Sequence, residues 1–183
     1  YDYTAEELEY GTGFPATYFK DDTINEDELI GGFAQLLNEM TSKPKITLEL
    51  GRSIAAICGK YYTHIVDKKC NKGENYLLVD GGMNHIVYYG QHMAMKQPYC
   101  TQLDTDGNEK TGGEEESWNL CGALCTVSDV VVKRFPLHKP QLHDILVFER
   151  VGAYSVTEGI YLFLSRPLPR IYFWTEGEGL RMV

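Results

Sequence analysis

Two patterns of hydrophobic and polar positions divide the chain near residue 51. Between residues 29 and 40 apolar side chains recur at helical spacing, at Leu29, Ile30, Phe33, Leu36, Leu37 and Met40. Asp22, Thr23 and Asn25 precede this segment and are typical helix caps. Short apolar stretches at residues 8–10 and 46–50 flank it and are typical of strands. The order strand, helix, strand predicts an α/β unit with a parallel sheet.

After Gly51 the pattern changes to β-rich segments separated by turn residues. We expect strands within residues 54–66, 76–80, 85–89, 129–134 and 144–150, and a hairpin formed by residues 170–174 and 180–183. The polar, acidic stretch 101–117 is expected to be a mobile loop without a chemical role. The sequence therefore predicts an α/β part, residues 1–51, followed by an antiparallel all-β domain, residues 52–183. Because two strands and a helix cannot close a sheet, the α/β part must pack on another chain or be the end of a larger domain.

Composition and charge exclude several partners. The 183 residues contain 17 Lys and Arg against 26 Asp and Glu, a formal net charge of −9, which repels nucleic acid and anionic membrane surfaces. The apolar runs are far shorter than the roughly 20 residues that span a bilayer, and no charged-then-apolar leader opens the chain. We therefore expect a cytoplasmic protein, with reduced thiols at its 5 cysteines. The chain begins at Tyr1 rather than Met, which suggests processing or a start inside a longer protein.

Two stretches where the predicted strands end could bind a ligand. The turn Gly11-Thr12-Gly13 could surround a phosphate with backbone N–H groups, although most glycine-rich turns bind nothing. In Glu49-Leu50-Gly51-Arg52, the Glu could hold a proton on a heterocyclic nitrogen and the Arg could pair with a phosphate. The alternative is an ordinary Glu and Arg beside a turn. Tyr154, after Gly152-Ala153, could give its hydroxyl to a phosphate or could simply pack.

Other reactive residue types show no arrangement typical of a catalytic or metal site. Cys121 and Cys125 lie four positions apart, but no second pair at suitable spacing accompanies them, so we expect no metal. The 5 histidines lack metalloprotease spacing, and no serine triad is indicated. The residues alone therefore predict a phosphate-binding α/β edge joined to a β domain.

Five motifs, taken in order, resemble those of the pyridoxal-phosphate-dependent decarboxylases of the diaminopimelate and ornithine type. They are Gly11-Thr12-Gly13-Phe14-Pro15, Glu49-Leu50-Gly51-Arg52, Asp80-Gly81-Gly82-Met83-Asn84, Cys121-Gly122-Ala123-Leu124-Cys125 with Asp129, and Gly152-Ala153-Tyr154. The resemblance runs from Leu8 to about Phe173. It implies that residues 1–51 are the last strands and helix of an eight-stranded, alanine-racemase-like (β/α) barrel. Residues 52–183 would be the antiparallel β-barrel or sandwich domain, with residues 152–164 returning to the cofactor barrel.

The resemblance also implies a role for each matching residue. Pyridoxal 5'-phosphate would be the cofactor, with its phosphate held by Gly11, Thr12, Gly13, Arg52 and Tyr154, and its pyridine nitrogen facing Glu49. Gly51 would also belong to the cofactor site. That carboxylate keeps the ring protonated, so that it accepts electrons when the carboxylate of an amino-acid substrate leaves as carbon dioxide. Cys125 would be catalytic, reaching the active site of the partner subunit and helping to protonate the product. The active form is therefore expected to be a homodimer.

Departures from the family pattern concern the covalent lysine and the substrate. The lysine that bonds to the cofactor lies, in this family, in strands ahead of the first residue of this chain, so we expect a C-terminal fragment that is inactive alone. Thr12 replaces the middle glycine of the usual turn. Thr126 follows the cysteine where related enzymes carry Glu or Asp, and residues 85–89, with Tyr88, lack the expected Arg. Tyr88, Thr126 and Asp129 are candidate substrate contacts. We expect a substrate other than diaminopimelate, as in relatives that act on siderophore or antibiotic precursors.

Two other functions remain open. A non-catalytic homologue could use the same fold to bind a partner protein, but it would not need Glu49, Arg52, Cys125 or Tyr154. An autonomous β-barrel binding module would not need residues 1–50 at all.

Overall fold

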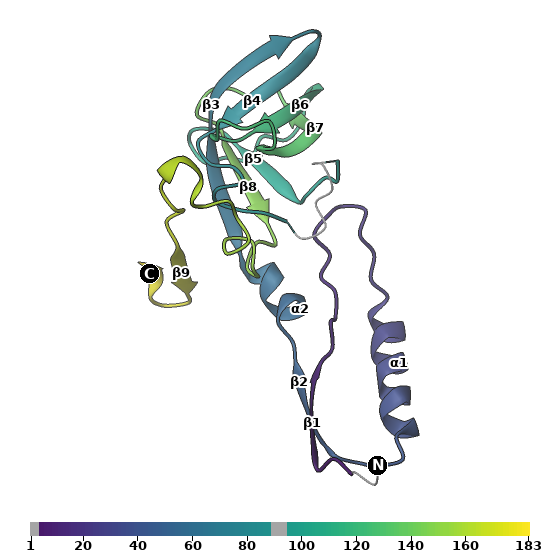
Figure 1. The fold of residues 1–183 in the computed structure, drawn as a ribbon. Coiled ribbons are helices and arrows are strands. Elements are labelled where there is room, and N and C mark those ends of the chain that lie inside the picture. The colour runs from purple at the N-terminus through teal and green to yellow at the C-terminus, as the bar shows by residue number, and fades with distance from the viewer. Residues whose placement is uncertain (1–3, 89–94) are drawn as a thin grey trace.

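The computed structural model describes residues 4–88 and 95–183. It has two lobes (Figure 1), a narrow lower one and an upper one built around a sheet. Tyr89, at the end of one predicted strand, lies outside the described residues.

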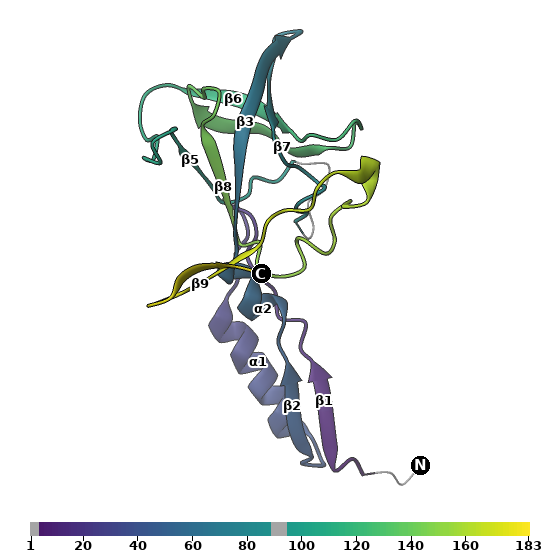
Figure 2. The ribbon, with the colours of Figure 1, turned by 90° about the vertical axis from the view of Figure 1, so that its left-hand side faces the viewer.

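The lower lobe has the predicted strand, helix, strand order. β1 (Glu7–Gly11) pairs in parallel with β2 (Lys45–Glu49), and α1 (Glu26–Glu39) connects them. The Asn25 side chain caps α1 by accepting a hydrogen bond from the Glu28 backbone N–H, as its position in the sequence predicts. Phe33 of α1 stacks on Tyr10 of β1, with ring centroids 5.8 Å apart. Figure 2 shows the two strands side by side, with α1 running beside them.

The upper lobe is a 6-stranded sheet in the order β5-β8-β3-β4-β6-β7. Its strands are β3 (Lys60–Asn71), β4 (Glu74–Val79), β5 (Cys100–Leu103), β6 (Glu115–Cys121), β7 (Val130–His138) and β8 (Ile145–Glu149). The expectation of an antiparallel domain is wrong at one pair, because β4 and β6 run parallel and make the sheet mixed. β3 pairs with β8 through its first half and with β4 through its second, with a bulge between Ile65 and Asp67. Fully buried side chains of these strands, such as Ile65, Leu120 and Phe148, form the core.

Two predicted strand segments differ from the structure. The segment predicted at 54–66 becomes a strand only at Lys60, because residues before it form a short helix, α2 (Arg52–Ala55), and a 3-10 turn, η1 (Ala56–Cys58). The chain turns there because Gly59 and Gly152 bring their backbones into contact, where a Cβ on either residue would overlap the other segment. Residues 85–88 contain a turn and extended backbone without a partner strand, although Ile86 and Tyr88 are buried as the alternation predicts. The hairpin of β9 (Tyr172–Thr175) and β10 (Gly179–Met182) is confirmed, and a 3-10 turn, η2 (Phe163–Ser165), precedes it.

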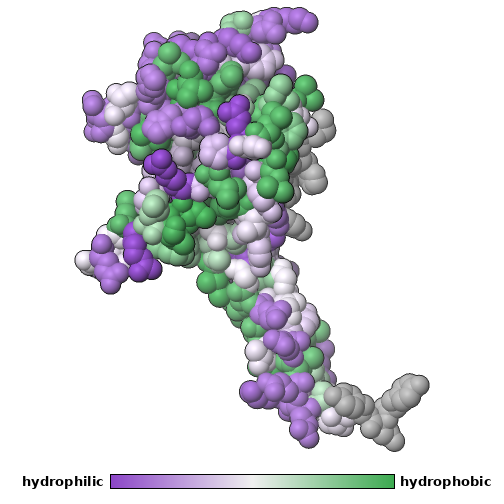
Figure 3. Space-filling model, turned by 60° about the vertical axis from the view of Figure 1, so that its left-hand side comes forward, coloured by the Kyte–Doolittle hydropathy of each residue, from purple (hydrophilic) through white to green (hydrophobic). Residues whose placement is uncertain are grey.

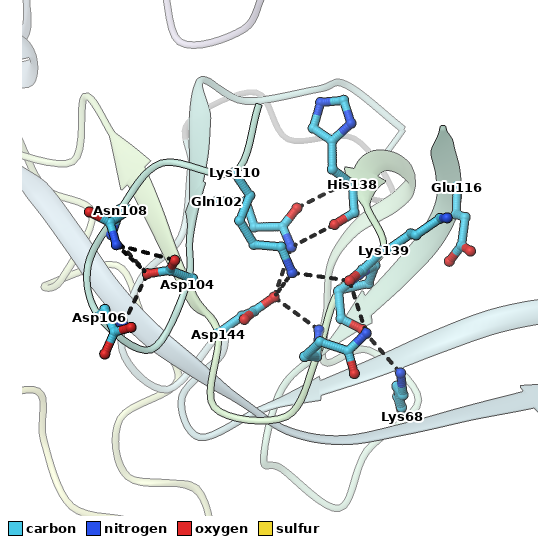
Figure 4. Close-up of polar contacts among 12 residues, drawn as sticks. Lys68, Gln102, Asp104, Asp106, Asn108, Lys110, Glu116, His138, Lys139 and Asp144 are labelled. Atoms are coloured by element: carbon cyan, nitrogen blue, oxygen red, sulfur yellow. Dashed lines mark hydrogen bonds and ion pairs between the residues drawn. The ribbon is translucent and has the colours of Figure 1, made fainter. Parts of the chain in front are cut away.

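The stretch 101–117, predicted as one mobile loop, instead contains most of β5 and the start of β6. The turn between them is held by the buried carboxylate of Asp144 (Figure 4), which accepts hydrogen bonds from Gln102 Nε2 at 2.9 Å and from Lys110 Nζ at 2.8 Å. The Asp104 side chain closes the turn by accepting from the backbone N–H of Asp106 and Asn108. Polar side chains therefore order this segment although its composition is that of a loop.

Residues 14–20 connect the lobes. Lys20 N donates to Gln97 O at 2.9 Å, and Phe19 forms an isolated bridge with Pro98. Arg150, at the end of β8, donates to the carbonyl and to the hydroxyl oxygen of Thr17. The segment that leaves β1 is therefore fixed to the sheet lobe. None of the helices in the described part of the chain has the length and apolar character needed to cross a bilayer.

Candidate cofactor site

The two parallel strands of the lower lobe end at the same edge. Gly11 and Glu49 are register partners, so the turn after β1 and the stretch after β2 begin side by side. The Thr12 hydroxyl donates to the Glu49 carbonyl at 3.4 Å and accepts from the Phe14 N–H at 3.3 Å. A carboxyl edge of parallel strands is the usual ligand-binding edge of α/β proteins.

A groove of about 580 Å³ lies at this edge, lined by residues of both strand ends and by one residue from the sheet lobe. Its lining consists of Gly11, Thr12, Gly13, Phe14, Pro15, Ala16, Tyr18, Glu49, Leu50, Gly51, Arg52, Ser53 and Tyr154. All of the residues that the sequence predicts to bind the cofactor therefore border one groove.

The Arg52 guanidinium is held between two tyrosines. It lies 4.8 Å from the ring centroid of Tyr154 and 5.8 Å from that of Tyr18, within the range of cation–π attraction. Its Nη1 donates to the Tyr18 hydroxyl at 3.0 Å, and its Nη2 lies 3.8 Å from Glu158 Oε1. Sequence reasoning missed Tyr18 and Glu158, because neither belongs to a recognisable motif.

Tyr154 reaches the groove from the sheet lobe in an unusual backbone conformation. Its φ is 62°, which is uncommon for a bulky residue and favours a functional position. Gly152 N donates to Ala56 O at 3.0 Å, which brings this segment against η1. A Cβ at Gly51 would lie 2.5 Å from the Tyr154 hydroxyl oxygen. Glycine at position 51 therefore lets the hydroxyl lie against the strand end.

The remaining predicted site residues do not line this groove. Cys125 and Thr126 lie in the turn between β6 and β7, with Cys125 exposed. Tyr88 is buried, donates to Glu149 O at 2.6 Å and packs edge-on against Tyr18. Its burial raises the pKa of its hydroxyl above the ordinary value. Tyr88 therefore packs behind Tyr18, a residue of the groove lining, rather than bordering the groove itself.

Asp129 ties two turns of the sheet lobe together. Its carboxylate, 2% exposed as a residue, accepts from Met83 N at 2.8 Å and from Leu124 N at 2.7 Å. It also packs against Gly82 and Gly122, where side chains would overlap it. Among the described residues no group of three or more His, Cys, Asp or Glu side chains could hold a metal ion.

The donor set of the groove fits a phosphate and a protonated heterocycle. Arg52 supplies a fixed positive charge, and Thr12, Tyr18 and Tyr154 supply hydroxyls. The turn has glycine at positions 11 and 13. Gly13 has a φ of 62°, a conformation that favours glycine, and nothing lies within 4 Å of where its Cβ would be. Glu49 supplies a carboxylate across the groove.

Comparison with known proteins identifies the family. Residues 22–152 match the family described as pyridoxal-dependent decarboxylase, C-terminal sheet domain, and the chain belongs to this family. It is 27% identical over 184 aligned positions, 92% of its length, to the L-glutamyl-[BtrI acyl-carrier protein] decarboxylase of Niallia circulans. It is 28% identical, over 82% of its length, to the 2-[(L-alanin-3-ylcarbamoyl)methyl]-2-hydroxybutanedioate decarboxylase of Staphylococcus aureus.

A solved structure shares the whole fold. Diaminopimelate decarboxylase of M. jannaschii superposes with a TM-score of 0.79 over 98% of this chain, at 24% identity. The chain spans 41% and 38% of the two curated relatives and 40% of the solved chain.

Proposed function

We propose that this chain is the C-terminal portion of a pyridoxal-phosphate-dependent amino-acid decarboxylase. The observation that supports this most strongly is the groove, where two parallel strand ends bring together Gly11, Glu49 and Arg52, and where Tyr154 joins them from the other lobe. Membership of the decarboxylase family supports the same reading.

Each groove residue then has a definite task. The turn Gly11-Thr12-Gly13, Gly51, Arg52 and Tyr154 bind the cofactor phosphate, with Arg52 contributing charge and the turn contributing backbone N–H groups. Glu49 accepts a hydrogen bond from the pyridine nitrogen and keeps that nitrogen protonated. When bound, pyridoxal phosphate serves as an electron sink for the bond that breaks as carbon dioxide leaves.

The lower lobe supports the proposal that residues 1–51 complete a (β/α)8 cofactor barrel and residues 52–183 form the sheet domain. Both strands and α1 expose apolar side chains that an isolated unit would bury, among them Ile30, Leu36 and Leu48. Figure 3 shows apolar surface on this narrow lobe as well as on the sheet lobe. Further strands of the same barrel would cover these faces.

The place of Cys125 supports a homodimer as the active form. It is exposed and lies outside the groove of its own chain. The neighbouring Val127 is 97% exposed, which is unusual for an aliphatic side chain and typical of an interface. We propose that this turn enters the site of a partner subunit, where the Cys125 thiol would donate a proton to the substrate carbon from which carbon dioxide has left.

The substrate is proposed to be an amino acid or amino-acid derivative other than diaminopimelate. Thr126 follows Cys125 and carries no charge, whereas the distal ammonium and carboxylate of diaminopimelate call for charged partners. The two curated relatives described above are named for decarboxylation of an L-glutamyl-[BtrI acyl-carrier protein] and of 2-[(L-alanin-3-ylcarbamoyl)methyl]-2-hydroxybutanedioate, and neither name mentions diaminopimelate.

Carbon dioxide release by the full-length polypeptide tests this proposal. The polypeptide is incubated with pyridoxal phosphate and a panel that includes meso-diaminopimelate, L-lysine, L-ornithine and L-glutamyl derivatives. We expect release from one class of the panel, and its loss in Glu49→Gln while cofactor is still bound. Binding of cofactor without release from any amino acid would favour the non-catalytic, partner-binding homologue instead. A clear preference for meso-diaminopimelate would contradict the substrate proposal alone.

A further inference from the structure

Tyr18 is the one buried aromatic residue at the border of the groove that no sequence motif marks. It is 2% exposed, yet it lines the groove, so only its edge meets the ligand space. Its ring packs edge-on against Tyr88 at 5.9 Å between centroids, and its backbone N–H donates to Asp22 Oδ2 at 2.9 Å. The core therefore fixes the ring of Tyr18, and Asp22 fixes its backbone.

The hydroxyl of Tyr18 has a defined direction. A phenol hydroxyl both donates one hydrogen bond and accepts others. Arg52 Nη1 donates to the oxygen at 3.0 Å, so the proton of Tyr18 itself must point away from the guanidinium. Within residues 4–88 and 95–183 no group accepts that proton, and the space beside it is the groove.

We propose that Tyr18 is a further phosphate-binding residue, which donates its hydroxyl proton to a phosphate oxygen that Arg52 also binds. The inference rests on the proposed function and extends it by one ligand-binding residue. Because the arginine orients the tyrosine oxygen, the two groups form one preorganised donor pair for an oxyanion. Tyr88 and Asp22 keep the pair in place when the groove is empty of ligand.

The test measures affinities of this chain for pyridoxal phosphate and for pyridoxal, which lacks the phosphate, by fluorescence titration. Tyr18→Phe removes the hydroxyl and keeps the ring that packs on Tyr88. We expect it to weaken pyridoxal phosphate binding roughly ten-fold or more, as for a lost hydrogen bond to a charged group, and to change pyridoxal binding less than about two-fold. The matched control is Tyr10→Phe, because Tyr10 stacks on Phe33 and does not line the groove.

The same titration in an Arg52→Lys background separates direct donation from an effect through the arginine. Lysine keeps a positive charge but not the planar fork. Direct donation predicts that Tyr18→Phe still weakens phosphate binding several-fold there, whereas no further loss would overturn the proposal. Equal losses for both ligands, or no loss for either, would overturn it as well. If the unsubstituted chain bound pyridoxal phosphate no better than pyridoxal, the proposed phosphate site itself would fail, and Tyr18 with it.

Discussion

Replacement of Asp129 by Asn should release the turn that carries Cys125. The carboxylate accepts from the N–H of Met83 and of Leu124, at 2.8 and 2.7 Å, in a site that is almost fully buried. Asparagine keeps one acceptor oxygen and places an NH2 group against the other donor. Because a hydrogen bond to a charged acceptor contributes about 1.5–3 kcal/mol, we expect a local destabilisation of about 3 kcal/mol.

Amide hydrogen exchange measures this effect directly. A loss of about 3 kcal/mol in local opening free energy corresponds to roughly 100-fold faster exchange at the Met83 and Leu124 amides. Peptides from α1 should exchange as before. The control is Asp106→Asn, on an exposed turn of the sheet lobe. Unchanged exchange at both amides in Asp129→Asn would refute the reasoning that this carboxylate holds the two turns together.

Three further substitutions test the site and the sheet lobe. Gly51→Ala places a Cβ 2.5 Å from the Tyr154 hydroxyl, so titration should show weaker pyridoxal phosphate binding, with Gly32→Ala, in open space on α1, as the control. Burial raises the pKa of Tyr61 to about 12 from about 10 in the unfolded chain. The folded protein therefore keeps its full stability below about pH 10 and loses part of it as the pH rises towards 12, because the unfolded chain releases this proton first. Tyr61→Phe should therefore show a smaller fall in unfolding free energy between pH 10 and 12, by up to about 2.7 kcal/mol. Asp144→Ala removes the carboxylate partner of the partly buried Lys110 ammonium, which keeps only its hydrogen bond to the Lys139 carbonyl, and should cost about 3 kcal/mol in chemical denaturation.

The lower lobe could be predicted from the sequence because its signals are local. The apolar spacing of α1 and its Asn25 cap determine the helix, and Gly11 and Glu49 mark where the strands end. The same locality explains why Gly11 and Glu49 end at one edge, whereas the candidate role of Tyr154 came only from the resemblance to the decarboxylase family. Parallel strands must place their carboxyl ends together.

The wrong strand predictions fall where the pattern of apolar residues fits a strand and a turn equally well. The apolar run 54–58 fits a buried strand or a helical turn equally well, and the close approach of Gly59 and Gly152 decides for the turn. Residues 85–88 alternate in burial like a strand, but the Val87 N–H bonds to Ser155 O rather than to a neighbouring strand. Such choices depend on contacts from distant parts of the chain.

Tyr18 and Asp144 show why part of the site and of the sheet lobe could not be predicted. Tyr18 is one of 13 tyrosines, and only the fold brings it against Arg52, 34 positions later. Asp144 orders a stretch of polar residues that is indistinguishable from a loop by composition, through hydrogen bonds to Gln102 and Lys110. Long-range polar partners leave no periodic trace in a sequence.

The measurement that tests the central claim most directly is a crystal structure of this chain with pyridoxal phosphate. The account predicts the phosphate at the edge formed by β1 and β2, within hydrogen-bond distance of the Gly11-Thr12-Gly13 turn, Arg52 and Tyr154, with Glu49 towards the pyridine nitrogen. A phosphate bound elsewhere, or a ring turned away from Glu49, would contradict it.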